Sequence, residues 1–73
     1  MAKYSYNSKA KYELSMRFKN VQAAKIFAWD NDAEVRDHAE DWVDMWINNK
    51  SDLNKFVKLA LNDENIVYFD VQK

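Results

Sequence analysis

Apolar and polar residues alternate strictly between residues 12 and 18, which is the clearest pattern in the chain. Successive side chains of a β-strand point to opposite faces of its sheet, so this period of two predicts a half-buried antiparallel strand. A short turn is expected directly after it, at residues 19–20. The side chains predicted to face the core are those of Tyr12, Leu14, Met16 and Phe18.

Residues 21–29 fit two structures. In a strand, Ala24, Ile26 and Ala28 would lie on one face and large aromatic side chains on the other. In a helix, the apolar positions would form only a weak stripe. Because β-branched and aromatic residues favour strands, and a strand here would complete a hairpin with the first one, the sequence predicts a second strand.

A helix is predicted over residues 33–48. Asn31 can cap its first turn, with Glu34 as the third residue of a variant capping box. At about 100° per residue, both tryptophans of this segment fall on one inward stripe, and the acidic residues fall on the opposite side. The inward stripe consists of Val35, Ala39, Trp42, Val43 and Trp46.

The C-terminal third of the chain predicts a second helix and a last strand. Ser51 is a good N-cap for a helix over residues 52–62. Its apolar face consists of Leu53, Phe56, Val57 and Ala60. After a turn, residues 66–72 alternate as a strand does, and the residues predicted on its core side are Val67, Phe69 and Val71.

The expected order is therefore strand, strand, helix, helix, strand. An α+β fold with a three-stranded antiparallel sheet and two helices on one face buries every apolar stripe in the simplest way. A single compact domain is expected over residues 11–73. Residues 1–10 show no clear period and are expected to form a flexible arm or an added edge strand.

Composition narrows the class of protein. The chain has 73 residues, of which 48% are hydrophobic and 15% aromatic, which is too rich for a disordered chain. It contains no Cys, Gly or Pro, so disulfides and thiolate metal sites are excluded and Asn takes over the turns. No apolar run is long enough to cross a membrane and the first residues lack an apolar stretch, so we expect a cytoplasmic protein without a membrane partner.

Charge is strongly segregated along the chain, although the net charge is only −1. Residues 1–29 contain six Lys and Arg and one Glu, whereas residues 30–49 contain one Arg and seven Asp and Glu. The remaining residues are balanced, with four of each sign. Segregation of this kind concerns surfaces and partners rather than the fold.

The acidic segment provides the first candidate site. On the predicted helix its carboxylates would form either a solvated face or a negative ridge that docks onto a basic groove of another macromolecule, with an apolar anchor at its margin. The residues predicted to bind the partner are Glu34, Asp37, Glu40, Asp41, Asp44 and Met45.

The basic segment provides an alternative. Lysines and arginines interleaved with tyrosines could hold single-stranded nucleic acid by charge and stacking, although the acidic ridge would repel phosphates. The candidate residues are Lys3, Tyr4, Tyr6, Lys9, Lys11, Arg17, Lys19 and Lys25. A third possibility is a structural homo-oligomer, such as a homodimer formed through an exposed sheet edge.

The sequence contains no recognisable catalytic or metal-binding motif. His38 is the only histidine, and on the predicted helix it would be a partly buried structural residue. Asp30, Asp32 and Glu34 are spaced like the start of a calcium loop, but Val35 stands where such a loop needs glycine. We therefore expect no enzyme activity, no cofactor and no bound metal.

In composition and layout the chain resembles the short early proteins of bacteriophages and mobile elements. The shared features are fewer than 80 residues, no cysteine, abundant Asn, Asp and Lys, and segregated charge. Such proteins include inhibitors of host RNA polymerase and anti-CRISPR and anti-restriction proteins. The resemblance implies a phage protein of the bacterial cytosol that inhibits a host nucleic-acid-handling machine by protein–protein contact, and it assigns no residue a role.

Overall fold

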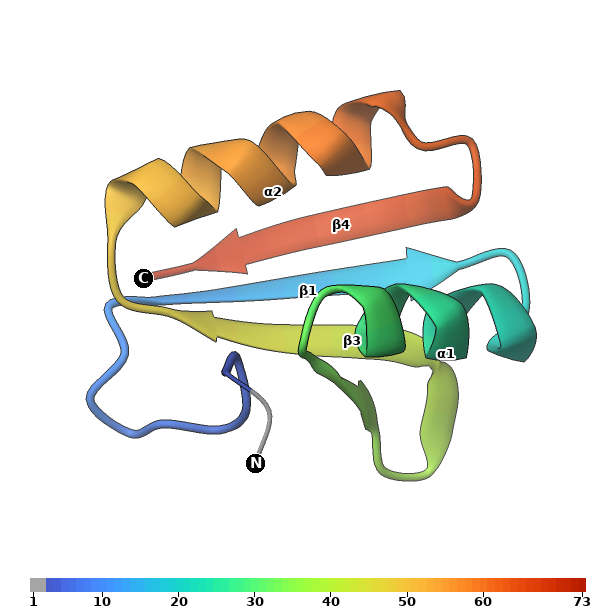
Figure 1. Ribbon diagram of the computed structural model, residues 1–73, viewed down its shortest axis with the longest axis horizontal. Coiled ribbons are helices and arrows are strands. Elements are labelled where there is room, and N and C mark those ends of the chain that lie inside the picture. Colours follow the sequence, from blue (N-terminus) through green and yellow to red (C-terminus); the bar gives the residue numbers. More distant parts are fainter. Residues whose placement is uncertain (1–2) are drawn as a thin grey trace.

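The computed structural model describes residues 3–73, which form six elements. In chain order these are β1 (Tyr12–Phe18), α1 (Val21–Asp30), β2 (Glu34–Arg36), β3 (Ala39–Ile47), α2 (Lys50–Asn62) and β4 (Ile66–Gln72). The strands form one antiparallel sheet in the order β2-β3-β1-β4 (Figure 1). The β-α-β-β-α-β chain order is that of ferredoxin-like domains.

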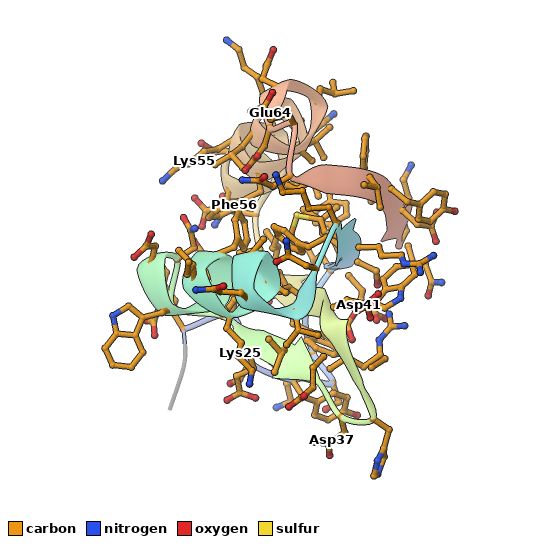
Figure 2. The ribbon with its side chains drawn as sticks, turned by 90° about the vertical axis from the view of Figure 1, so that its right-hand side faces the viewer. Lys25, Asp37, Asp41, Lys55, Phe56 and Glu64 are labelled. Atoms are coloured by element: carbon orange, nitrogen blue, oxygen red, sulfur yellow. The ribbon has the colours of Figure 1, made fainter. Side chains whose placement is uncertain are left out.

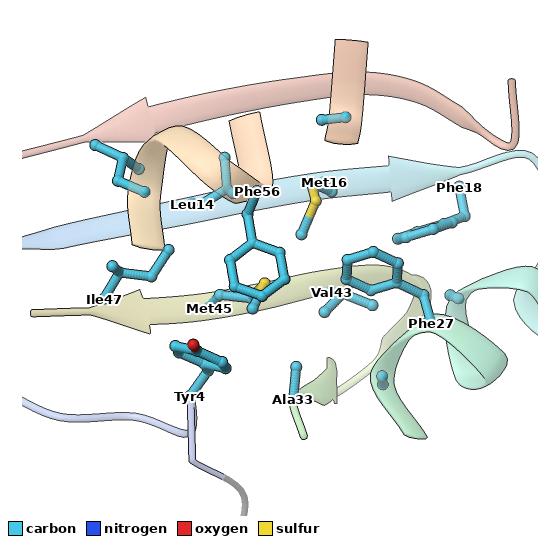
Figure 3. Packing of buried hydrophobic residues seen from close by; sticks show 14 residues of the cluster. Tyr4, Leu14, Met16, Phe18, Phe27, Ala33, Val43, Met45, Ile47 and Phe56 are labelled. Carbon is cyan, nitrogen blue, oxygen red and sulfur yellow. The ribbon is translucent and has the colours of Figure 1, made fainter. Parts of the chain in front are cut away.

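Both helices pack on the same face of this sheet. They share one core with Leu14 and Met16 of β1 and with Val43 and Met45 of β3, which all point to that face (Figure 3). Helix α1 packs mainly on β3 and β2, and α2 packs on β1, β3 and β4. The α+β class and the placement of two helices on one face are therefore confirmed, but the sheet has four strands rather than three.

The predicted helix over residues 33–48 is wrong, because this segment forms β2 and β3. Val43, Met45 and Ile47 alternate with Trp42, Asp44 and Trp46, so one set faces the helices and the other the opposite side. Because indoles occupy the second set, both faces of β3 carry apolar residues and the period of two is concealed. The inward helical stripe that joined both tryptophans to Val43 does not exist.

The predicted strand over residues 21–29 is also wrong, because this segment is α1. The side-chain oxygen of Asn20 caps the helix by accepting a hydrogen bond of 2.8 Å from the N–H of Ala23. Ala24, Phe27 and Ala28 are buried at helical spacing. The stripe is weak in the sequence because its contact with the sheet uses two small alanines, while other apolar residues of α1 remain in solvent.

The first strand, the second helix and the last strand are confirmed, with two differences of detail. Helix α2 is capped by Asn49 rather than Ser51, and the side chain of Asn49 accepts a bond of 2.7 Å from the N–H of Asp52. In β4, Phe69 and Val71 face the core, but Val67 is 59% exposed. The pairing of β1 with β4 shifts register between Arg17 and Phe18, which moves Val67 out of the core.

Residues 3–10, which belong to the predicted arm, form neither helix nor strand, and residues 1–2 lie outside the described part. Tyr4 fixes this segment to the domain. Its backbone N–H donates to the carbonyl of Asp32 at 3.1 Å, and its carbonyl accepts from the N–H of Trp46 at 3.0 Å. Its ring is buried edge-on against Phe56, with 5.2 Å between the centroids. The N-terminal segment is thereby held along β3.

Candidate functional site

The face of the sheet opposite the helices is uncovered, and we call it the open face. Antiparallel partners share a face, so the strand register identifies its members. Figure 2 shows one of them, Asp41, on the side of the sheet away from α1. The open face consists of Tyr6, Glu13, Ser15, Arg17, Glu34, Arg36, Asp41, Trp42, Asp44, Trp46, Tyr68, Asp70 and Gln72.

Two aromatic groups lie on the open face. Trp42 of β3 and Tyr68 of β4 stand on either side of Arg17, and their rings meet edge to face at 5.9 Å. Trp46 lies further along β3, and Tyr6 from the N-terminal segment packs on it at 5.3 Å. Aromatic rings left on an uncovered sheet are available to a partner, since they combine large contact area with low conformational entropy.

Arg36 and Asp44 form the central ion pair of this face. The guanidinium donates to both carboxylate oxygens, at 2.8 and 2.7 Å, and lies 4.5 Å from the ring centroid of Trp42. Asp44 is only 8% exposed. Burial raises its pKa, but hydrogen bonds from Arg36 and Ser15 lower it by more, so the pKa of Asp44 is below the usual 3.8. The pair is thus charged at neutral pH.

The open face is negative overall. It carries five carboxylates, on Glu13, Glu34, Asp41, Asp44 and Asp70, against two guanidinium groups, which leaves three negative charges. Both arginines are engaged within the face, Arg36 with Asp44 and Arg17 with Asp41 at 3.1 Å. Glu13, Glu34 and Asp70 make no ion pair with any of the residues 3–73.

Two clefts flank the Tyr6–Trp46 pair. One, of about 290 Å³, lies toward β2 and is bordered by three carboxylates as well as by both rings. Its lining residues are Tyr6, Glu34, Val35, Arg36, Asp37, Asp44 and Trp46. The other, of about 270 Å³, lies toward β4 and includes Glu13 and Gln72. The first cleft combines an aromatic wall with three carboxylates, which suits a cationic side chain, whereas the second has one glutamate beside Lys11 and Lys73.

The predicted acidic ridge is only partly reproduced. Glu34, Asp37 and Asp44 come together at the first cleft, although they lie on β2, the turn and β3 rather than on a helix. Glu40 instead lies 3.9 Å from Lys25 of α1. Met45 is fully buried beneath the helices, so it cannot be an apolar anchor for a partner.

Sequence reasoning missed the aromatic members of the open face. Both indoles of residues 33–48 were predicted in the core, but Trp42 and Trp46 are half-buried on the opposite side of the sheet. Tyr68 is not among the predicted site residues. The alternation of residues 41–47 was the signal that could have found the two tryptophans, because in a strand they share a face with Asp44.

The structure also does not bring together the residues of the alternative site, the predicted basic surface for nucleic acid. The predicted hairpin does not exist, since its second strand is α1. Tyr4 is buried in the core, and Lys25 lies on α1, on the other side of the sheet from Arg17. Lys3, Lys9 and Lys11 belong to the N-terminal segment and Lys19 to the turn after β1. These residues therefore do not form one continuous basic surface.

Among the described residues there is no metal-binding cluster and no membrane-spanning helix. Within residues 3–73 no cluster of three or more His, Asp or Glu side chains is arranged to hold a metal ion. His38 lies exposed at the tip of the β2–β3 turn, with a positive φ of 62°, and is not the partly buried helical residue that was predicted. Neither helix is long and apolar enough to cross a membrane.

The polar groups of the interior are fully used by the fold. In the part of the chain that the structure describes, every buried side-chain nitrogen or oxygen has a hydrogen-bond partner. No polar group is therefore directed at an internal ligand cavity. The candidate site is accordingly a surface, the open face.

Comparisons with known proteins do not assign this surface. No family model matches the sequence, and neither curated proteins nor solved structures gave a match. The shared chain order with ferredoxin-like domains concerns architecture alone, and one architecture supports many functions. The chemistry of the open face therefore carries the functional argument.

The free energy of unfolding should depend on pH through two side chains, the carboxyl of Asp44 on the open face and the phenol of Tyr4 in the core. A carboxyl whose pKa is lowered by folding, such as that of Asp44, stabilises the fold above its ordinary pKa of 3.8 and loses this effect as the pH falls through the lowered value. Burial raises the pKa of Tyr4 above 10.0, and its hydrogen bond to Asp52 adds to the rise, so its contribution is lost at higher pH. We expect a plateau from about pH 5 to about pH 9.

Urea unfolding measured across this pH range tests the expectation. Asp44→Asn should reduce the loss of stability below about pH 4, and Tyr4→Phe should reduce the loss above about pH 10. Unchanged acid and alkaline limbs in both variants would contradict the assignment.

Proposed function

We propose that this protein is a non-enzymatic binding protein that docks its open face onto a basic surface of another protein. The proposal rests chiefly on one observation, the interleaving of exposed aromatic rings with carboxylates that are in excess by three charges. Lysine and arginine side chains are the protein groups that such a surface attracts, through cation–π contact and charge-assisted hydrogen bonds.

Arg36 shows how the face holds a cation. Its guanidinium lies over the indole of Trp42 while both of its hydrogen bonds reach Asp44. The cleft beside it offers a similar combination, in which Glu34 and Asp37 stand near the rings of Tyr6 and Trp46. A partner's arginine or lysine entering this cleft would meet the same chemistry that the protein already uses internally.

Nucleic acid is the less suitable ligand for this face. In RNA-recognition domains a four-stranded sheet uses aromatic residues to stack bases, and the rings of Trp42, Trp46 and Tyr68 favour that alternative. Nucleic-acid sites need cations for the phosphates, however, and both arginines of the face are held by carboxylates. The remaining acids would repel a phosphate backbone, so the charge of the face favours a protein partner.

We further propose that the partner is a host nucleic-acid-handling machine, such as RNA polymerase or a CRISPR or restriction complex. Surfaces that bind phosphates present the lysines and arginines that the open face complements. Occupation of such a surface would exclude the nucleic acid sterically and by charge. Inhibition of this kind requires no catalytic group, and the resemblance to small phage-encoded inhibitors supports it.

The open face can be tested without knowing the partner, because the chain contains three tryptophans in different places. Trp42 and Trp46 lie on the open face, whereas Trp29 is 88% exposed on α1. A peptide of alternating lysine and arginine, added to ¹⁵N-labelled protein, should shift the indole N–H signals of Trp42 and Trp46 and leave Trp29 unchanged. The shifts should weaken with added salt.

A single-stranded RNA oligonucleotide at the same concentration and salt serves as the counter-probe, and we expect it to leave all three indole signals in place. Shifts of Trp42 and Trp46 with RNA but not with the peptide would overturn the proposal in favour of nucleic-acid binding. A peptide response confined to Trp29 would also overturn it, since binding would then involve the helical side.

A further inference from the structure

The outer edge of β4 is exposed and has few of the features that protect sheet edges. This strand ends the sheet order, and no other strand within residues 3–73 pairs with its outer side. Its seven residues, IVYFDVQ, contain one charged side chain, that of Asp70, and no Lys, Arg or Pro. The opposite edge, β2, has only three residues, two of them charged. Short length and charge protect β2, whereas β4 can pair with another strand.

An exposed apolar flank accompanies this edge. Val67 of β4 is 59% exposed and Leu61 of α2 is 69% exposed. Leu61 lies in the last turn of α2, off the buried stripe of Leu53, Phe56 and Ala60. Figure 1 shows α2 beside β4, and the chain passes directly from one to the other, so the end of α2 that carries Leu61 adjoins the start of β4 that carries Val67.

We propose that two copies of this chain pair through their β4 strands, antiparallel and about a two-fold axis at Phe69, to form a continuous eight-stranded sheet. Residues that oppose each other across an antiparallel pair share a face. One residue must therefore lie directly opposite its own copy, with the two-fold axis midway between the two copies. With the axis at Phe69, Tyr68 faces Asp70 of the second copy, and Val67, displaced by the register shift, lies beside this pair at the joint. An axis at Asp70 would instead oppose two carboxylates.

The edge favours a second copy over a foreign strand because it is self-complementary. In the proposed register each carboxylate meets a tyrosine, whose hydroxyl can donate to it, and the exposed Val67 of each copy lies at the joint. The two α2 helices run antiparallel beside the joint, which brings the apolar flank of each copy to the other. A two-fold axis perpendicular to the sheet also leaves both open faces on one side. Pairing does not require the open face to bind anything.

Light scattering after size exclusion tests the dimer, at concentrations from about 10 μM to about 1 mM, which spans the dissociation constants of weak interfaces. One chain has a mass of 8.7 kDa, and we expect the measured mass to double as concentration rises. Val67→Lys should keep the protein monomeric, because it places a charge at the joint. Ile26→Lys is the matched control, since Ile26 is exposed on α1, and it should dimerise like the natural protein.

Cross-linking tests the register, because the chain has no cysteine of its own. An oxidised mixture of Tyr68→Cys and Asp70→Cys chains should form a disulfide-linked pair that contains one of each. Either variant alone should stay single, because its two cysteines would lie more than about 7 Å apart.

A monomeric natural protein at every concentration would overturn the proposal, as would a Val67→Lys variant that still dimerises. Cross-linking of either cysteine variant with itself would overturn the register. Loss of the dimer in Ile26→Lys would place the interface on α1 instead. Because these measurements involve no basic partner, their failure is distinguishable from failure of the proposed function.

Discussion

Replacement of Phe56 by alanine should lower the free energy of unfolding by about 3–5 kcal/mol. Phe56 is 2% exposed and joins three parts of the core, because its ring meets Tyr4 at 5.2 Å and Phe27 at 6.5 Å as it projects from α2 (Figure 3). A domain of this length is stabilised by about 4–11 kcal/mol in total, so the variant should be near its unfolding threshold. Urea unfolding followed by circular dichroism measures the loss.

Ile26→Ala is the control for this prediction. The side chain of Ile26 is exposed on α1, so its truncation should change stability by no more than about 0.5 kcal/mol. A loss below about 1.5 kcal/mol in Phe56→Ala would contradict the packing described here, since it would mean that the ring can leave the core without a cavity.

Reversal of three open-face charges should abolish binding to a basic partner while leaving the fold in place. Glu13→Lys, Glu34→Lys and Asp70→Lys together convert an excess of three negative charges into an excess of three positive charges. None of the three carboxylates makes an ion pair with residues 3–73, so stability should change by less than about 1 kcal/mol. Loss of more than about 100-fold in affinity corresponds to about 2.8 kcal/mol, or roughly 1 kcal/mol per site.

The comparison is made by affinity capture from a bacterial lysate, with the natural chain and the reversed variant side by side. The captured protein should be identified as a nucleic-acid-binding one, and excess DNA should release it from the natural chain. A matched control reverses three acids elsewhere, Asp30, Glu40 and Glu64, and should retain binding. Equal capture by both triple variants would rule out the open face as the docking surface.

This choice of control separates two hypotheses about the acidic segment. The sequence predicts Glu40 as part of a binding ridge, whereas the structure places it beside Lys25 of α1. Asp44, another predicted member, is unsuitable for reversal because it holds Arg36 in a buried pair, and a lysine there would leave two cations facing each other. Glu34 and Asp37 are the predicted members that remain both exposed and unpaired within residues 3–73, and of these two Glu34 lies on the open face.

Pairing across the sheet explains why the pattern of residues 33–48 predicts a helix where the structure has two strands. Residues 41–47 satisfy a helical stripe and a strand alternation at once, because tryptophans and aliphatic residues occupy adjacent positions. Local pattern cannot choose between the two. The choice depends on β1, which pairs with β3 along six positions from Tyr12 to Arg17, and this contact joins residues about 30 apart in the chain. The prediction for residues 21–29 failed for a related reason, since α1 gains its stability from packing on that sheet.

The candidate site changed with the fold. Segregated charge was visible in the sequence, and the structure partly compensates it, since Arg17 and Lys25 of the basic segment lie beside Asp41 and Glu40 of the acidic one. Exposed pairs of this kind contribute little to stability. The sequence did not predict which acids share a surface with aromatic rings. That grouping depends on β3, which directs alternate residues to opposite faces, whereas a helix would not.

The sequence by itself determined the α+β class, strand β1, helix α2, strand β4 and the uneven distribution of charge, because each of these depends on residues close together in the chain. Only the tertiary structure decided that residues 21–30 are helical and residues 34–47 extended, and hence that Trp42 and Trp46 face away from the core. The physical reason is that a central strand obtains its hydrogen bonds and its packing from distant partners. The location of the open face follows from that long-range pairing.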